Sequence, residues 1–263
     1  MNKQSLIIKS TLVLNFICFI GMMFVNFQSY MGQINDVAIS ESFDKYNNLF
    51  TPAPITFFAW GIIYSALLVF VFWQLKSVFS KNIKPEIYMV TSKTSQLFIL
   101  SCIFNCAWIL AWQFDKMLYS TLMMTGLLWT LIKINRHISF DLTVTPRYRS
   151  FLKIPFGMYL GWVSIVLISN VAAYLTKIEW QGFGIDPRFW QMSMVLFASL
   201  IACWSVIKLN NVAYGLIVLW ALGGILMVRL ADTIPSLSMS LLVTLCALLV
   251  LFTTLNRTKY WAI

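Results

Sequence analysis

The chain alternates long apolar runs with short clusters of charged and turn-forming residues. A transmembrane helix needs about 20 mainly apolar residues. Cutting the sequence at its charges gives eight segments of about this length, with both ends of the chain on one side of a membrane. They cover residues 9–28, 54–75, 95–114, 117–133, 154–176, 189–207, 212–228 and 234–255. The pattern therefore predicts an all-α polytopic membrane protein with about eight transmembrane helices.

Composition agrees with this pattern. Of the 263 residues, 60% are hydrophobic and only 11% are charged, and the mean hydropathy is +0.79. A soluble domain usually carries about a quarter charged residues, so these charges are too few to cover a soluble globule of this size. The composition argues against a soluble enzyme, a nucleic-acid-binding protein and a disordered chain.

The net charge of +10 is explained by the sidedness of the predicted spans. The segments on the side that holds both termini contain 14 of the 19 Lys and Arg residues and two of the nine acidic residues. The cytoplasmic side of a membrane protein is usually the more basic one. We therefore expect a multi-pass protein of the bacterial cytoplasmic (inner) membrane, with both termini cytoplasmic, membrane lipids as partners and no nucleic acid.

The predicted spans lack the residues that most catalytic and transport mechanisms need. None carries an ionisable residue away from its ends, which argues against a pump, an ion-coupled transporter and an intramembrane hydrolase. All five cysteines lie inside spans without a Cys-x-x-Cys pair, and the only histidine, His137, lies in a basic loop. We therefore expect no metal site, no cofactor and no enzymatic activity.

Asn, Trp and Tyr recur at helical spacing in three of the spans. Asn105, Trp108 and Trp112, for example, fall on one stripe of the third span. Asn is costly in hydrocarbon without a partner, so Asn105 and Asn170 should face the interior together with their aromatic neighbours. An aromatic-lined pocket below the polar external loop 28–53 suits a hydrophobic, flat aromatic ligand. The predicted ligand-binding residues are Trp60, Tyr64, Asn105, Trp108, Trp112, Trp162 and Asn170.

Simpler explanations compete with a pocket. Asn105 and Asn170 could hydrogen-bond to each other and only hold two helices together. Trp60, Trp108 and Trp162 could pack without lining a site. Interfacial belts explain tryptophans near span ends, and three more tryptophans have no clear assignment. The belt residues are Trp73, Trp180, Trp190 and Trp261, and the unassigned ones are Trp129, Trp204 and Trp220.

Small residues mark one close helix contact. Gly157 and Gly161 form a GxxxG pair in the fifth predicted span. Such a pair lets two helix backbones approach closely. It fits either a homodimer face or packing within the chain.

Three sequence elements, all within residues 1–177, carry a family resemblance. They are residues 51–64 (TPAPITFFAWGIIY), residues 105–108 (NCAW), and the set Pro155, Phe156, Trp162 and Asn170. In this order they resemble the second-, third- and fifth-helix motifs of the TspO/MBR family, the tryptophan-rich sensory proteins related to the translocator protein.

The resemblance implies a five-helix unit, often dimeric, that binds porphyrins and other tetrapyrroles, sterols or synthetic hydrophobic ligands beneath its first loop. We therefore expect residues 1–177 to form a TspO-like unit and residues 178–263 to add three helices, as in a longer, eight-helix branch. The expected function is to bind such a hydrophobic ligand, for example a porphyrin or a lipid, and to sense or translocate it. Two alternatives stay open: a permease-type subunit that works with a separate ATPase, and a membrane enzyme acting on a lipid or pigment.

Overall fold

The computed structural model describes residues 3–36, 45–46, 50, 52–80, 82–141, 145–231 and 237–259. Within these ranges the chain is helical and has no strand. Eight helices are long and apolar enough to cross a membrane, which confirms the predicted all-α, multi-pass fold. They are α1 (Lys3–Tyr30), α3 (Phe58–Leu75), α4 (Pro85–Gln113), α5 (Met117–Arg136), α6 (Pro146–Lys177), α7 (Pro187–Leu209), α8 (Val212–Ala231) and α9 (Leu237–Thr258). Short helical segments lie at η1 (Pro54–Phe57), η2 (His137–Asp141) and η3 (Gly182–Gly184).

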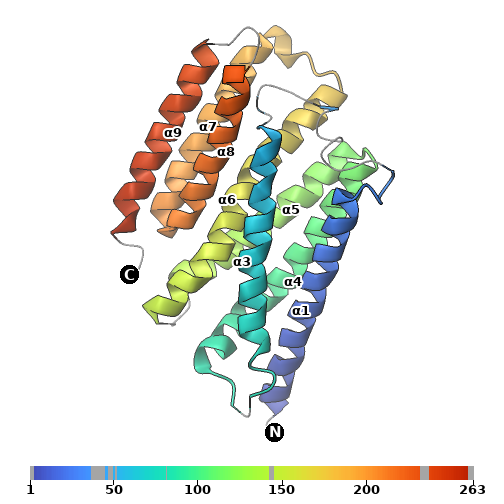
Figure 1. Ribbon diagram of the computed structural model, residues 1–263, viewed down its shortest axis with the longest axis vertical. Coiled ribbons are helices and arrows are strands. Elements are labelled where there is room, and N and C mark those ends of the chain that lie inside the picture. The colour runs from blue at the N-terminus through green and yellow to red at the C-terminus, as the bar shows by residue number, and fades with distance from the viewer. Residues whose placement is uncertain are drawn as a thin grey trace.

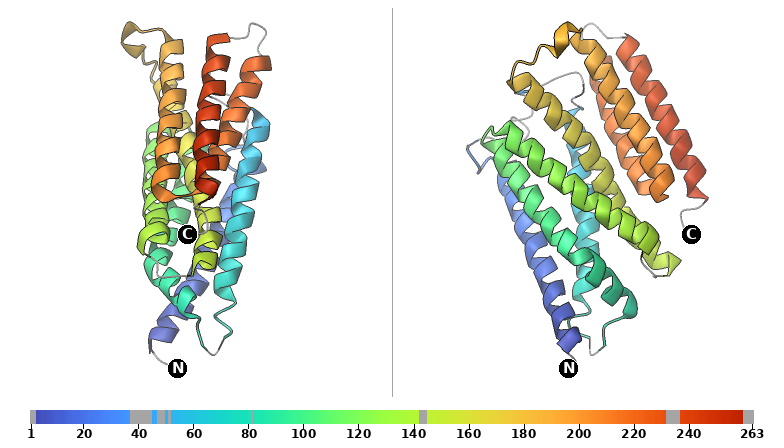
Figure 2. Two further views of the ribbon diagram at one scale, coloured as in Figure 1. Left: turned by 90° about the vertical axis from the view of Figure 1, so that its left-hand side faces the viewer. Right: turned by 180° about the vertical axis from the view of Figure 1, so that it is seen from behind.

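Helix α6 is at the centre of the bundle. It packs against α3, α5 and α8 and makes a smaller contact with α7. Helices α1, α4 and α5 lie on one side of it, and α7, α8 and α9 lie on the other (Figure 1 and Figure 2). Helix α1 begins and helix α9 ends toward the same end of the bundle (Figure 1), as an even number of spans requires. The side of the membrane on which this end lies remains a prediction.

Three helices begin six or more residues earlier than the apolar pattern predicts, and α1, which begins at Lys3, is one of them. Helix α4 begins at Pro85 and helix α6 at Pro146, eight to ten residues before the expected starts. Proline suits the first turn of a helix because the N–H groups of that turn have no partner within the helix. The correction affects Lys153, which was expected in a loop. It lies inside α6 and is only 3% exposed.

The GxxxG pair of α6 faces α8. A Cβ atom on Gly161 would lie only 2.9 Å from the backbone oxygen of Tyr214, and one on Gly157 would collide with the side-chain amide of Asn211. The missing side chains therefore let α8 approach α6 closely. The pair serves packing within the chain, and it joins the two predicted parts of the sequence. Their status as separate units remains a prediction.

The unassigned tryptophans occupy different surroundings. Trp129 and Trp204 are 50% and 65% exposed, so they lie on the outer surface of the bundle. Trp220 of α8 donates a hydrogen bond from Nε1 to the backbone oxygen of Thr56 at 2.9 Å. It therefore ties α8 to η1, just before α3. Trp261, expected in the interfacial belt, lies outside the described residues.

Candidate functional site

Trp60 of α3 lies at the centre of an aromatic cluster inside the bundle. Its ring centroid is 5.7 Å from that of Trp108 on α4, and the planes are inclined by 28°, so the two indoles are stacked. Edge-to-face contacts at 6.0 and 6.1 Å join Trp60 to Trp162 and Tyr159 of α6. Tyr64, one turn further along α3, lies 5.3 Å from Trp60. These five residues form what we call the aromatic cluster, in geometries that aromatic rings favour.

A hydrogen-bond network borders the aromatic cluster. The fully buried Asn105 of α4 donates from Nδ2 to the hydroxyl of Tyr159 at 3.1 Å and to that of Tyr64 at 3.3 Å. Its Oδ1 accepts a hydrogen bond from Asn26 of α1 at 2.8 Å. The Oδ1 of Asn26 accepts one from Tyr64 at 2.7 Å. Because buried polar groups need partners, this network joins α1, α3, α4 and α6 at one level.

Helical spacing explains how three helices supply the aromatic cluster and its network. Residues three or four positions apart project from the same face of a helix, and α3, α4 and α6 each contribute such a pair. Trp108 and Trp162 are each 1% exposed, whereas Trp60 is only partly buried. The structure brings together five of the seven predicted residues. They are Trp60, Tyr64, Asn105, Trp108 and Trp162.

The other two predicted residues lie elsewhere along the helices. Asn170 is fully buried, but it donates to Ser120 at 3.1 Å and accepts from Thr121 at 2.9 Å, both on α5. Among the described residues it makes no hydrogen bond to Asn105, so the expected alternative of an Asn–Asn pair is wrong. Trp112 is buried one turn beyond the aromatic cluster on α4.

Sequence reasoning missed two members of the site. Tyr159 lies three residues before Trp162 on the same face of the fifth predicted span. It was not among the predicted ligand-binding residues, although its hydroxyl accepts a hydrogen bond from Asn105. Asn26 was not singled out at all. The signal was present, because an Asn in the apolar first span needs a buried partner as much as Asn105 does.

Two N–H groups of the aromatic cluster are buried without a hydrogen-bond partner in the part of the chain that the structure describes. They are the indole Nε1 groups of Trp108 and Trp162. Leaving a buried donor without a partner costs about 1–3 kcal/mol. The aromatic cluster therefore offers two indole donors to a molecule that carries an acceptor.

Asp115, in the turn between α4 and α5, holds part of the external loop. Its carboxylate accepts a hydrogen bond from the hydroxyl of Tyr46 at 2.6 Å and pairs with Lys45 at 3.0 Å and with Lys177 at 2.9 Å. Burial alone would raise the pKa of Asp115, but the hydrogen bonds from Tyr46, Lys177 and Lys45 outweigh it and lower the pKa to about 2. The loop is thereby fixed to the ends of α4 and α6.

Part of the predicted cap, residues 37–44, 47–49 and 51, lies outside the described residues. Of the described part, the N–H of Ala53 donates to the backbone oxygen of Gly224 on α8 at 3.1 Å. The segment that leads into α3 is therefore attached to α8. The role of residues 28–53 as a cap remains a prediction.

Fold and site together define a multi-pass helical membrane protein with a tryptophan-rich aromatic cluster. The sequence matches the family described as TSPO-like protein over residues 12–255, and the chain belongs to this family. No curated protein and no solved structure matches the chain.

The family match extends beyond the resemblance seen in the sequence. It begins within α1 and ends within α9, so it includes the three C-terminal helices as well as the first five. Members of this family are generally not enzymes. No group of three or more His, Cys, Asp or Glu residues that could hold a metal ion occurs in the described ranges.

Proposed function

We propose that this protein binds a hydrophobic, flat aromatic molecule in the aromatic cluster between α3, α4 and α6. The observation that carries the proposal is the pair of buried indole N–H groups, on Trp108 and Trp162, that have no partner. Membership in the TSPO-like family and the location of the cluster within a membrane bundle support the same function.

Trp60 marks the position that the ligand takes. Its indole is a flat aromatic system that stacks on Trp108 and meets Tyr159 and Trp162 edge-on. Trp60 is also the partly exposed member of this group, whereas its three neighbours are buried. A flat ligand that displaced Trp60 by a side-chain rotation would inherit these contacts. The aromatic cluster then acts as a preformed site that Trp60 occupies in the absence of ligand.

The indole N–H groups determine which polar group the ligand must carry at its periphery. Indole N–H groups are donors only, so the ligand needs an acceptor, such as a carbonyl or carboxylate oxygen, within reach of Trp108 or Trp162. A porphyrin carries both a large flat ring and carboxylates, and it is the specific ligand that we propose. Binding serves sensing or translocation of this ligand.

Titration with protoporphyrin tests the proposal. Purified protein in nanodiscs is titrated while Trp fluorescence quenching and the shift of the porphyrin absorption band are recorded. Wild-type protein is expected to show saturable quenching with one site. The double substitution Trp108→Ala with Asn105→Ala removes the stacking surface and the network, and it should weaken binding at least tenfold.

The matched control is Trp204→Ala, which removes a tryptophan that is 65% exposed on the outside of α7. It should leave the affinity unchanged and lower only the starting fluorescence. Absence of saturable binding, or equal affinities for the wild-type protein and the double variant, would exclude the porphyrin site.

A further inference from the structure

A cavity lies at the end of the bundle where α6 passes into α7. Its volume is about 420 Å³, within the range of small-molecule sites. The last turns of α6, the turn η3 and the first two turns of α7 form its walls. It is separate from the aromatic cluster, with which it shares no residue. The cavity depends on α7 and is therefore a product of the C-terminal helices.

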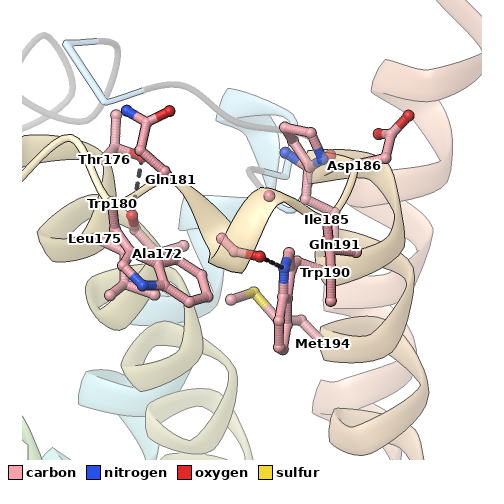
Figure 3. A pocket seen from close by; sticks show the side chains of 13 residues that line it. Ala172, Leu175, Thr176, Trp180, Gln181, Ile185, Asp186, Trp190, Gln191 and Met194 are labelled. Atoms are coloured by element: carbon pink, nitrogen blue, oxygen red, sulfur yellow. Dashed lines mark hydrogen bonds between the residues drawn. The ribbon is translucent and has the colours of Figure 1, made fainter.

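Two tryptophans form the apolar part of this cavity. The ring centroids of Trp180 and Trp190 are 5.2 Å apart and their planes are inclined by 59°, so the two indoles pack against each other in a tilted arrangement. Figure 3 shows Met194 beside these rings and Asp186 at the edge of the group. Leu175 adds a further apolar surface. Such a wall accepts either a hydrocarbon chain or a cation, because the negative face of an indole attracts positive charge.

Three hydrogen-bond donors of the cavity are used within the protein. The indole N–H of Trp190 donates to the backbone oxygen of Gly182 at 3.0 Å. The amide of Gln181 donates to the backbone oxygen of Glu179 at 2.9 Å, and the hydroxyl of Thr176 donates within α6. These three groups have little left to offer a ligand that carries acceptors.

Acceptors remain in the cavity. The Oε1 of Gln191 is buried and has no hydrogen-bond partner among the described residues. Asp186 is the only charged residue of the lining. Its Oδ1 accepts a hydrogen bond from the N–H of Arg188 at 2.7 Å and so caps α7. The positive end of the α7 dipole is thereby met by a carboxylate, which disfavours a second anion at this place.

We propose that this cavity binds the ammonium headgroup of a membrane amphiphile, with the indole faces of Trp180 and Trp190 against the cation. The position at the ends of α6 and α7 is where a lipid headgroup lies when the helices span the bilayer. The chain of the lipid runs along Leu175 and Met194. We assign the site to an intact lipid and not to a free amine.

Native mass spectrometry tests this assignment. Delipidated protein is incubated with equal amounts of phosphatidylethanolamine and phosphatidylglycerol that carry the same acyl chains, and retained lipid is counted. Wild-type protein is expected to keep one phosphatidylethanolamine with a preference of about fivefold or more, as cation–π attraction at a partly desolvated site predicts. Equal retention of both lipids, or preference for phosphatidylglycerol, would overturn the proposal.

Two substitutions test whether the preference for phosphatidylethanolamine arises in this cavity. Trp180→Leu keeps an apolar side chain but removes an indole face, and Asp186→Asn removes the charge while keeping a good helix cap. Each should lower the preference at least threefold. Trp204→Leu, on the exposed outer surface of α7, is the control and should keep it. An unchanged preference in both cavity variants would show that the lipid binds elsewhere.

Competition identifies the source of the ammonium group. Phosphoethanolamine, the free headgroup, is added at millimolar concentration to the protein–lipid complex. We expect no displacement, because the free headgroup lacks the chain that contacts Leu175 and Met194. Complete displacement would overturn the assignment to an intact lipid.

Discussion

Trp60 stacks on Trp108 at a centroid separation of 5.7 Å, although the two residues belong to different helices. The contact fills the aromatic cluster with the protein's own side chain. For a flat ligand to bind in the aromatic cluster, one of the side chains that fill it must be able to rotate out. Trp60 fits this role because it is only partly buried, whereas Trp108 is 1% exposed.

Trp60→Ala should therefore have opposite effects on stability and binding. Removing the indole leaves a cavity and should destabilise the protein by about 3 kcal/mol. The same cavity should raise the affinity for protoporphyrin, because Trp60 no longer has to be displaced. Thermal unfolding with and without the ligand measures both effects. The ligand should raise the melting temperature more in Trp60→Ala than in wild type, and a smaller rise would contradict the role of Trp60.

Asn105→Leu should disrupt the network that joins four helices. The substitution leaves the hydroxyl of Tyr159 and the amide of Asn26 without their partner. Loss of such a buried partner costs about 1–3 kcal/mol. Thr125→Val is the matched control, because Thr125 is exposed and its hydroxyl bonds only within its own helix. Unfolding curves in denaturant should separate the two variants, and equal stabilities would contradict the network's importance.

Gly161→Val should separate α8 from α6. A side chain at this position meets the backbone of Tyr214, which cannot move aside as a flexible side chain can. Overpacking of this kind costs about 1–3 kcal/mol. Gly61→Val on α3 is the control, since a Cβ at Gly61 has no atom within 4 Å. Limited proteolysis in nanodiscs should show faster cleavage between α6 and α8 in Gly161→Val only. Equal cleavage of both variants would contradict the contact.

The attachment of the external loop to Asp115 should be lost at low pH. The folded pKa of Asp115 is about 2, below its usual value of 3.8. Because the folded pKa is lowered, the stabilisation is fully present above pH 4 and is lost as the pH falls toward 2. The emission of a fluorophore on the Lys45–Tyr46 segment should therefore stay constant from pH 7 to pH 4. Below pH 4 it should change as the segment detaches from Asp115.

Asp115→Asn should release the same fluorophore already at pH 7, because neither Lys45 nor Lys177 then meets a charge. Glu179→Gln, at the same end of the bundle, is the control. A signal that is equal in wild type and Asp115→Asn at pH 7 would exclude the ion pairs as the attachment.

The spans were predictable because a bilayer requires long apolar helices, and the pattern found all eight. The starts of α4 and α6 could not be predicted from the apolar pattern, since Pro85 and Pro146 begin these helices in polar sequence. Periodicity also identified the buried face that carries Asn105 and Trp108.

Periodicity does not identify the neighbour that a face meets. Asn105 and Asn170 both face the interior, yet the first contacts α1, α3 and α6 and the second contacts α5. The contact between Gly161 and α8 likewise depends on the order of helices in space. The cavity beside Trp180 and Trp190 depends on how the chain turns from the end of α6 through η3 into α7, which the apolar periodicity does not predict.

Photolabelling tests the central claim most directly. Protein in nanodiscs is illuminated with bound protoporphyrin that carries a photoreactive group, and the labelled peptides are identified by mass spectrometry. The account predicts label on the segments of α3, α4 and α6 that contain Trp60, Trp108 and Trp162, with loss of label in Trp108→Ala. Label confined to the outer surface of the bundle, or to the cavity between α6 and α7, would contradict it.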